Sequence, residues 1–359
     1  MGTAKKAYLV LENGKIFEGV SCGCEGTAYG EVVFTTGMNG FQQTLTDPTY
    51  YGQIVTQTFP IIGSYGANEK DFESDKCHLN GYIVREMCDE PSNFRMDSTM
   101  NEFLKKQNVV GICGIDTRML TRLIRENGVM NGAITTEEID DKDSFVTKIS
   151  AYKQTDGLKM TSIASPRMFK AENSTKHVAL LDLGHKFYIK NKLNDMGCDV
   201  TVMPYDTIAE QISIVNPDGI LISNGPGNPN EYAKIAANIK EIAELGVPVF
   251  GIGLGHQLLA LANGGKVAKL KYGHRGENQP VIDIEWGRTF VTSQNTGFVV
   301  ENIPENAELS HKSANDSGCE GLCYKNGNYS VQFYPDACET QTGTSYVFDK
   351  FMDLMGGKK

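Results

Sequence analysis

The segment Val249-Phe-Gly-Ile-Gly253-Leu-Gly-His-Gln257-Leu-Leu-Ala-Leu-Ala262 joins a short apolar run directly to a helical pattern through a turn centred on Gly253. In open α/β sheets, ligand sites form where a strand ends and the next helix begins. A nucleophile elbow has this form, because it holds its central residue at a strained backbone angle and points the side chain into the site. A tight packing turn without any ligand is the alternative. This segment alone leaves both interpretations open.

Strand and helix patterns alternate on the amino-terminal side of this turn. The apolar runs VALLDLG, CDVTVMP and GILIS are separated by the helical stretches FYIKNKLNDM and TIAEQISIV, and a further helical stretch precedes PVFGI. This alternation is typical of an α/β fold with a mainly parallel open sheet that helices cover on both faces. We place this domain at residues 177–359.

The first part of the chain is rich in strand patterns instead. AYLVLE and KIFEGV flank Asn13-Gly14, a residue pair that tolerates positive φ and predicts a two-residue hairpin loop. EVVFTT and QIVTQTF continue the β pattern, with glycine, asparagine and proline between them. These patterns predict an α+β domain at residues 1–150.

A helix is expected near the end of this domain. Asp116 or Thr117 can cap its start, and Asn127-Gly128 closes it. Its apolar face is expected to comprise Met119, Leu120, Leu123 and Ile124. After it, residues 151–176 are polar and show no sustained period of either kind, which predicts a linker between two domains.

The charge and composition exclude several classes of partner. The chain has 34 basic and 44 acidic residues, a formal charge of -10, which repels nucleic-acid phosphates and anionic lipid headgroups. No apolar run approaches the roughly 20 residues that span a bilayer, and the first residues lack the apolar stretch of a secretory signal. We therefore expect a cytoplasmic protein that binds neither nucleic acid nor membrane.

The nine cysteines indicate a reducing compartment, because their number is odd and they are scattered through a large chain. The pairs Cys22-x-Cys24 and Cys319-x3-Cys323 have spacings like those of metal ligands. Few histidines lie near either pair in the sequence. We expect reduced thiols and no metal site.

GIGLGHQLLALA resembles the nucleophile segment of class I glutamine amidotransferases, and is most similar to carbamoyl-phosphate synthase small subunits, in which the position of Gly253 is a cysteine. The segments LTDPTYYGQIVTQTFPIIGSYGAN, SNFR, GIDTRMLTRLIRENGVMNG, SNGPGNP and YGHRGENQPV also resemble that family. Several of them lie in the amino-terminal domain, which other amidotransferases do not share. The resemblance implies a small-subunit α+β domain followed by a class I glutamine amidotransferase domain.

The family's catalytic triad is altered at all three positions. A cysteine thiolate attacks the glutamine amide, a histidine transfers the proton, and a glutamate orients the histidine. By the resemblance, Gly253, Tyr334 and Asp336 occupy these positions. Glycine has no nucleophile, and a phenol with a pKa near 10 is a poor proton shuttle at neutral pH. Cys338 is the alternative nucleophile, but it would need close placement and a partner base, so we predict that glutamine hydrolysis is lost.

Two more departures from the family, and one residue of its motif, lie nearby. Gln279 and Thr296 stand where the family commonly has histidine, and His256 belongs to the family motif, where it is expected to pack rather than catalyse. Because these departures cluster around one pocket, we hypothesise a natural protein in which selection for glutamine hydrolysis has lapsed.

The resemblance also implies positions that contact glutamine, and these differ less from the family. Backbone amides of Gly225, Gly227 and Leu254 would hold the substrate and the oxyanion. The hydroxyl of Thr49, where the family has serine, would donate a hydrogen bond. Ordinary turn chemistry and loop packing are the alternatives. The remaining lining positions are Gln257, Asn295, Gly297 and Phe298.

The resemblance implies a partner, a large synthetase subunit that makes carbamoyl phosphate from bicarbonate, ATP and ammonia, in a heterodimer or a higher assembly. ATP and Mg are expected there, because this chain lacks a G-x-x-x-x-G-K-[ST] phosphate loop and needs no cofactor of its own. We rank a structural and allosteric subunit first, a non-catalytic glutamine sensor second, and an active glutaminase with rearranged machinery last. Whether the product serves arginine or pyrimidine biosynthesis stays open.

Overall fold

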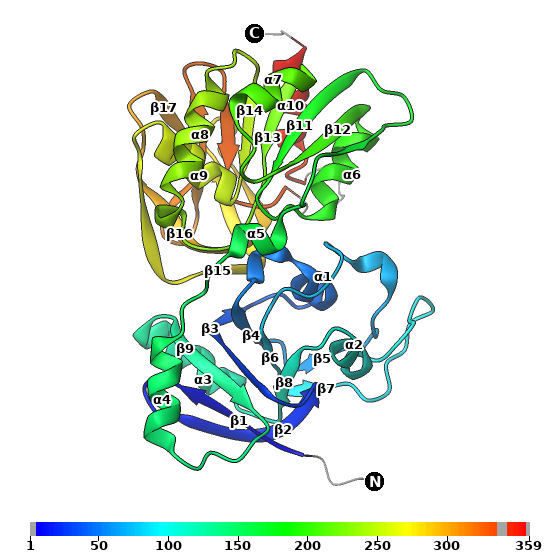
Figure 1. Ribbon diagram of the computed structural model, residues 1–359, viewed down its shortest axis with the longest axis vertical. Helices are drawn as coiled ribbons and strands as arrows, with labels where there is room; N and C mark the ends of the chain where they lie inside the picture. Colours follow the sequence, from blue (N-terminus) through cyan, green and yellow to red (C-terminus); the bar gives the residue numbers. More distant parts are fainter. Residues whose placement is uncertain (1–4, 336–342, 357–359) are drawn as a thin grey trace. The chain divides into compact units, whose positions relative to one another are not determined.

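The computed structural model describes residues 5–335 and 343–356. Within it the chain divides into two compact units, Met1–Thr155 and Asp156–Lys359 (Figure 1). Each unit has its own sheet and its own hydrophobic core.

A closed barrel forms the centre of the first unit, with strands in the order β1-β2-β8-β6-β4-β3-β9. Its pairing is mixed, since β3, β4, β6 and β8 pair in parallel with one another in that order and the remaining pairs are antiparallel. Closing the sheet removes exposed strand edges. The barrel strands are β1 (Lys6–Leu11), β2 (Ile16–Gly23), β3 (Thr27–Thr35), β4 (Gln53–Gln57), β6 (Gly81–Ile83), β8 (Val110–Cys113) and β9 (Met130–Thr135).

Helices and a small second sheet surround this barrel. The two short strands β5 and β7 pair in parallel beside it. The predicted α+β character of this part of the chain is confirmed. The elements are β5 (Ile61–Ile62), β7 (Glu86–Met87), α1 (Phe41–Thr46), α2 (Met100–Lys106), α3 (Thr117–Asn127), α4 (Lys142–Ala151) and the 3-10 turns Pro48–Tyr50 and Glu69–Asp71.

The predicted hairpin between β1 and β2 is present, but its loop has three residues, 12–14, rather than two. The amide of Leu11 donates to the carbonyl of Lys15 at 2.9 Å, and the amide of Gly14 donates to the carbonyl of Leu11 at 2.8 Å. Gly14 has φ 79°, whereas Asn13 is not in the left-handed region. A three-residue loop needs positive φ only at its last position, so one glycine is sufficient.

Helix α3 has the predicted ends. The Asp116 side chain accepts a hydrogen bond from the Met119 amide at 2.8 Å, and Gly128 caps the other end with φ 93°. Leu120 and Ile124 are buried, as predicted. Met119 is 41% exposed, so its assignment to the apolar face was wrong. It lies about 100° around the helix from Leu120, which turns it toward solvent.

The second unit contains one large mixed sheet, with strands in the order β10-β12-β11-β13-β14-β19-β18-β16-β15-β17. The five strands from β12 to β19 in this order are parallel, and the others pair with antiparallel neighbours. The strands are β10 (Arg167–Phe169), β11 (Lys176–Asp182), β12 (Cys198–Pro204), β13 (Gly219–Ile222), β14 (Val249–Ile252), β15 (Lys266–Asp283), β16 (Arg288–Asn302), β17 (Ala307–Ser313), β18 (Cys319–Tyr324) and β19 (Tyr329–Val331).

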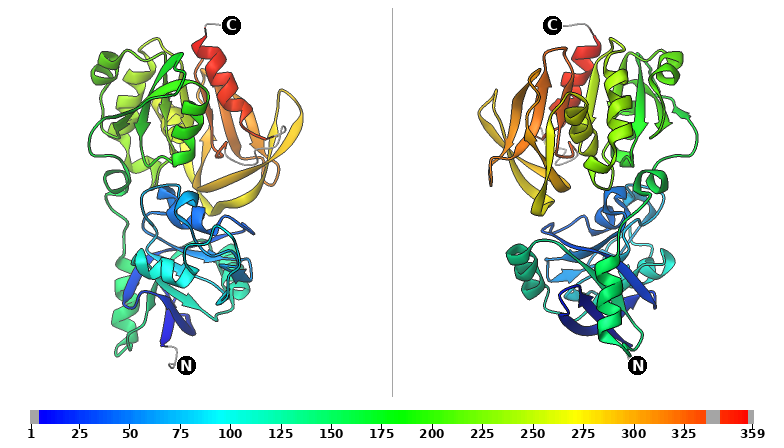
Figure 2. Two further views of the ribbon diagram at one scale, coloured as in Figure 1. Left: turned by 90° about the vertical axis from the view of Figure 1, so that its right-hand side faces the viewer. Right: turned by 60° about the vertical axis from the view of Figure 1, so that its left-hand side comes forward.

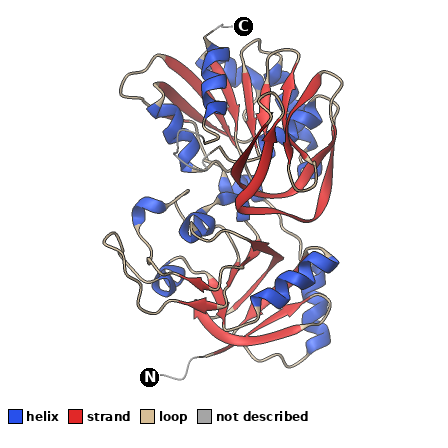
Figure 3. Ribbon diagram, turned by 180° about the vertical axis from the view of Figure 1, so that it is seen from behind, coloured by secondary structure: helices blue, strands red, loops and turns tan. Residues whose placement is uncertain are grey.

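Helices cover both faces of this sheet, as expected for an α/β fold (Figures 2 and 3). One core contains side chains of α7, α8 and α9, and the other contains side chains of α6 and α10. The helical elements are α5 (Gly157–Thr161), α6 (Phe187–Asp195), α7 (Ala209–Val215), α8 (Ala233–Ala243), α9 (Leu254–Ala262), α10 (Tyr346–Met355) and the 3-10 turn Pro229–Glu231.

The segment predicted as a linker, residues 151–176, contains structure of its own. It holds helix α5 and strand β10, and β10 pairs antiparallel with β12 at the edge of the large sheet. A strand of three residues is too short to show a period in the sequence. Most of this segment therefore belongs to the second unit, which begins at Asp156.

The turn between β15 and β16 carries Trp286, the only tryptophan of the chain. Its ring lies against Tyr346 at the start of α10, with 4.5 Å between ring centroids, and it is 51% exposed. The Tyr346 hydroxyl donates to Asp283 at 2.7 Å, and the Trp286 amide donates to the same carboxylate at 2.9 Å. These contacts hold α10 against the β15–β16 hairpin.

No described helix is both long enough and apolar enough to cross a bilayer.

Candidate functional site

The predicted strand-to-helix turn joins β14 to α9. Gly253 lies at its centre with φ 60° and ψ −112°, and its amide donates to the carbonyl of Val331 on the neighbouring strand β19 at 2.9 Å. The next glycine, Gly255, allows close packing, because a Cβ there would lie 2.2 Å from the carbonyl oxygen of Ile222. The turn thus has the backbone form of a nucleophile elbow with no side chain at its centre.

Tyr334 lies beside this turn, three residues after β19. A Cβ built on Gly253 would lie 3.6 Å from Cε1 of Tyr334, so the structure brings together these two positions, which the resemblance assigns to the triad. The ring is 4% exposed, and its hydroxyl donates to the carbonyl of Asn295 at 3.4 Å. The ammonium of Lys186 lies 4.9 Å from the ring centroid. Asp336 and Cys338, the two other residues singled out here, lie outside the described residues.

The chemistry of this pair differs from that of a cysteine and a histidine. Glycine presents no atom that could form a covalent bond with a carbonyl carbon. A phenol ordinarily loses its proton near pH 10, so at neutral pH it can donate a hydrogen bond but cannot take a proton as a base. Gly253 and Tyr334 therefore offer neither a thiol nor an imidazole.

The loop SNGPGNP follows β13 at the same end of the sheet and contains Gly225 and Gly227. A Cβ on Gly225 would lie 2.2 Å from the carbonyl oxygen of Leu183, and one on Gly227, which has φ 98°, would lie 2.1 Å from the Tyr232 hydroxyl. Close approach to the Leu183 backbone accounts for Gly225, and positive φ accounts for Gly227, without a ligand. The predicted role of their amides in glutamine binding stays a prediction.

Leu254 is the first residue of α9 and is buried. Its amide is one of the helix's first four, which have no acceptor inside the helix. Such an amide, at the positive end of the helix, can bind an anionic oxygen. The predicted oxyanion role of the Leu254 amide stays a prediction.

Gln257 uses its side-chain amide inside the protein. Its Nε2 lies 3.1 Å from the hydroxyl of Thr296, 3.0 Å from the carbonyl oxygen of Phe298 and 2.8 Å from Oε1 of Gln332. The Thr296 hydroxyl in turn donates to the Phe298 carbonyl at 2.8 Å. These bonds join α9 to β16 and to the residue after β19. Gln257, Thr296 and Phe298 therefore form one hydrogen-bond network. The two side-chain amide hydrogens of Gln257 are already shared among its three acceptors.

Asn295 and Gly297 lie on β16, in the same strand as Thr296 and Phe298. A Cβ on Gly297 would lie 3.2 Å from Nη2 of Arg275, a buried residue that pairs with Asn295 in the β15–β16 ladder. Gln279 also lies near this arginine, since its Nε2 donates to the Arg275 carbonyl at 3.3 Å. The structure therefore places Asn295, Gly297, Arg275 and Gln279 together in the β15–β16 part of the sheet.

Thr49 belongs to the first unit, in the 3-10 turn after Asp47. Its amide and its hydroxyl both donate to Oδ1 of Asp47, at 2.9 and 2.7 Å. This arrangement is an Asx turn reinforced by a side-chain bond. The predicted contact of Thr49 with glutamine stays a prediction.

His256 is buried beneath the elbow, where its Nδ1 lies 2.8 Å from the hydroxyl of Ser330 on β19. Burial lowers the pKa of His256 to about 3, and repulsion from His311 acts in the same direction. The imidazole is therefore neutral at physiological pH. It packs α9 against the sheet, as the sequence analysis expected.

Three residues of this region were not predicted from the sequence. Lys186 and Asn224 follow β11 and β13, and the Lys186 amide donates to Oδ1 of Asn224 at 3.3 Å. Gln332 follows β19. All three could have been found from their place in the sequence, just after a predicted strand. Side chains that follow neighbouring parallel strands meet at one edge of a sheet.

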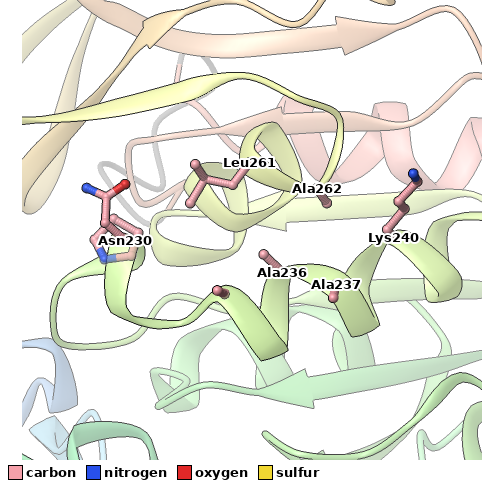
Figure 4. Close-up of a pocket in the computed structure, with 8 residues that line it drawn as sticks. Asn230, Ala236, Ala237, Lys240, Leu261 and Ala262 are labelled. Atoms are coloured by element: carbon pink, nitrogen blue, oxygen red, sulfur yellow. The ribbon is translucent and has the colours of Figure 1, made fainter.

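A separate pocket of about 310 Å³ lies between α8 and α9 (Figure 4). Figure 4 shows the small side chains of α8 facing Leu261 and Ala262, with Asn230 and Lys240 toward its two ends. None of the predicted site residues lines it. In the described ranges 5–335 and 343–356, no group of three or more His, Cys, Asp or Glu side chains has a metal-binding arrangement.

Two family models match the chain. The model described as "Carbamoyl-phosphate synthase small chain, CPSase domain" matches residues 9–134, and the model described as "Glutamine amidotransferase class-I" matches residues 179–354. The first match lies in the barrel unit, and the second covers most of the sheet that carries the elbow.

Curated relatives resemble the chain over almost its whole length. A carbamoyl phosphate synthase small chain from Clostridium perfringens is 45% identical over 97% of this chain and 99% of its own. One from Listeria monocytogenes is 43% identical over 99% of this chain and 98% of its own. Among solved structures, a proposed GMP synthase component from Thermoplasma acidophilum aligns with a TM-score of 0.45 at 23% identity, over 51% of this chain and 94% of its own.

Proposed function

The chain belongs to the carbamoyl phosphate synthase small-chain family and has a class I glutamine amidotransferase domain, and from this membership we propose that it is a non-hydrolysing small subunit. It docks on a large synthetase subunit and supports synthesis of carbamoyl phosphate from bicarbonate, ATP and free ammonia. ATP and Mg bind in the large subunit, and this chain requires no cofactor. The complex works in the cytoplasm.

One observation supports the loss of hydrolysis most directly. Gly253 stands at the elbow, and Tyr334 fills the space beside it with a buried ring. Hydrolysis through a thioester needs a sulfur nucleophile at the first position and a base of near-neutral pKa at the second. Both requirements fail together, so nitrogen must enter the reaction as ammonia.

A small subunit without hydrolysis still has a role. A large obligate interface stabilises the folded state of both partners by mass action, so removing one subunit lowers the stability of the other. The relatives' full-length match is consistent with retention of the whole two-unit architecture.

The decisive experiment reconstitutes this chain with its large subunit and measures carbamoyl phosphate formation with glutamine or with an ammonium salt. A family member that has cysteine at the elbow serves as the control with the same large subunit. We expect synthesis from ammonium only, whereas the control should use both nitrogen sources. Equal synthesis from glutamine in ammonia-free buffer would show that another nucleophile acts in this chain.

The same assay separates the regulatory alternative from this proposal. Glutamine is added without ammonium, and ATP hydrolysis by the large subunit is followed. We expect no change in its rate. A change in ATPase rate without glutamate release would identify this chain as a glutamine sensor instead.

A further inference from the structure

We infer that the solvent face of α3 is a docking surface for an acidic patch on the large subunit. This inference rests on the proposed function, because it names the surface through which the proposed complex forms. The docking face is defined as Arg118, Met119, Arg122 and Arg125.

The geometry of α3 sets these residues apart from its buried side. Thr117, Leu120 and Ile124 face the interior of the first unit. Residues at i, i+4 and i+7 lie on one side of a helix, so Arg118, Arg122 and Arg125 form a line along the opposite side. The three guanidinium groups therefore cover about two turns of exposed helix.

The charge of this face contrasts with that of the chain. The formal charge is -10, yet three of the eight arginines fall within residues 118–125. Within the described ranges, Arg118 makes no ion pair, and Arg122 reaches only Glu126, at 4.0 Å between side chains that are 73% and 68% exposed. Such exposed pairs contribute little to folding stability. Arg118 and Arg122 are thus available for carboxylates on a partner.

The composition of the face matches that of protein interfaces. Met119 is 41% exposed and lies three residues before Arg122, at the edge of the line of arginines. Arginine and methionine are enriched in the buried centres of interfaces, where lysine is depleted, and arginine is a frequent hot-spot residue. An exposed methionine beside arginines offers apolar contact, and the guanidinium groups offer bidentate hydrogen bonds to carboxylates.

The helix is also held rigidly, which lowers the entropy lost on binding. Asp116 caps its start through the Met119 amide, and the Gly128 amide donates to the carbonyl of Ile124 at 2.7 Å. A docking face that is ordered before binding keeps more of its contact energy as affinity.

A protein partner fits this surface better than nucleic acid. Duplex binding depends on many phosphate contacts, and a net charge of -10 repels a long polyanion. A local acidic patch on a folded protein needs only the few guanidinium groups present here.

The test measures the dissociation constant between this chain and its large subunit for wild type and for Arg118→Glu/Arg122→Glu. We expect charge reversal to weaken binding on the order of 30-fold and to reduce its salt dependence, since opposite charges would become like charges. Arg85→Glu, an exposed arginine of the same unit outside α3, is the matched control and should change binding less than about twofold. Circular dichroism and melting temperature check that each variant folds.

Arg118→Gln/Arg122→Gln provides a second variant that keeps helix propensity without repulsion. It should weaken binding by an intermediate factor. If wild type binds and both double variants bind equally well, the docking face is wrong while the proposed function stands. If wild type fails to bind the large subunit, the proposed function fails and this inference falls with it. Tight binding of duplex DNA that needs Arg118 and Arg122 would also overturn it.

Discussion

Gly253 occupies a backbone conformation that side chains rarely adopt, with φ 60° and ψ −112°. A Cβ at this position would also lie 3.2 Å from Cβ of Asn224. We predict that Gly253→Cys lowers the free energy of unfolding by about 1–3 kcal/mol, because strained residues of this kind cost that much. Urea denaturation measures this loss. The variant should release no more glutamate than wild type, since catalytic groups that act as a unit are strongly non-additive.

Gly246 provides a control for the backbone effect. It has φ 81°, but a Cβ there would meet no atom within 4 Å. Gly246→Cys should therefore cost less than Gly253→Cys, because it adds no close contact to the cost of the positive φ. Glutamate release by Gly253→Cys alone would contradict the assignment and indicate that Tyr334 or another group acts as a base.

The buried His256 should make stability depend on pH. Its pKa is about 3 in the folded protein, whereas an unfolded histidine titrates near 6.5. Between these values the unfolded state binds more protons, so the free energy of unfolding falls as the pH falls from 6.5 toward 3. We predict that His256→Gln is less stable than wild type at pH 7.5 and that the gap narrows at pH 5. Urea denaturation at both values checks this, and a gap independent of pH would refute it.

The candidate site was only partly visible in the sequence at the residue scale. Gly253 and Tyr334 were identified because each follows an apolar strand in a segment that resembles a known motif. The hydrogen-bond partners of Gln257 could not be identified, because Thr296 and Gln332 come from separate parts of the sequence and no local pattern links them. Close approaches such as that of Gly225 to Leu183 likewise exist only in the folded chain.

At the scale of single elements, the N-cap of α3 gives a quantitative test. Asp116→Ala removes the acceptor of the Met119 amide and should lower the free energy of unfolding by about 1 kcal/mol. Asp116→Asn keeps an oxygen acceptor and should be nearly neutral. Urea denaturation compares both with wild type. A loss for asparagine as large as that for alanine would show that charge, not the hydrogen bond, stabilises this end.

Elements with clear end signals were predicted well, and long irregular ones were not. The ends of α3 and the β14–α9 turn followed from caps and glycines that act within a few residues. Strands β15 and β16 pair along most of their length, but their register shifts between Lys269 and His274 and again between Gly276 and Gln279. Each shift moves side chains to the other face, so the alternation that marks a strand is lost.

At the scale of the whole molecule, the two units differ in how their cores are built. The core of the first unit packs side chains of barrel strands against those of α1 and α2, whereas the second unit has a core on each face of an open sheet. The sequence predicted this change of architecture, because alternating strand and helix patterns begin only after residue 176. It did not predict closure of the barrel, which depends on the pairing of β1 with β9 across more than a hundred residues.

Trp286 makes the second unit optically distinct. The chain has one indole, half exposed on the β15–β16 turn and packed against Tyr346 of α10. Excitation at the red edge of protein absorbance therefore selects this unit, because the tyrosines of the barrel absorb very little there. A shift of the emission maximum reports separation of α10 from the hairpin, so unfolding or ligand-induced movement in one unit can be followed without a label.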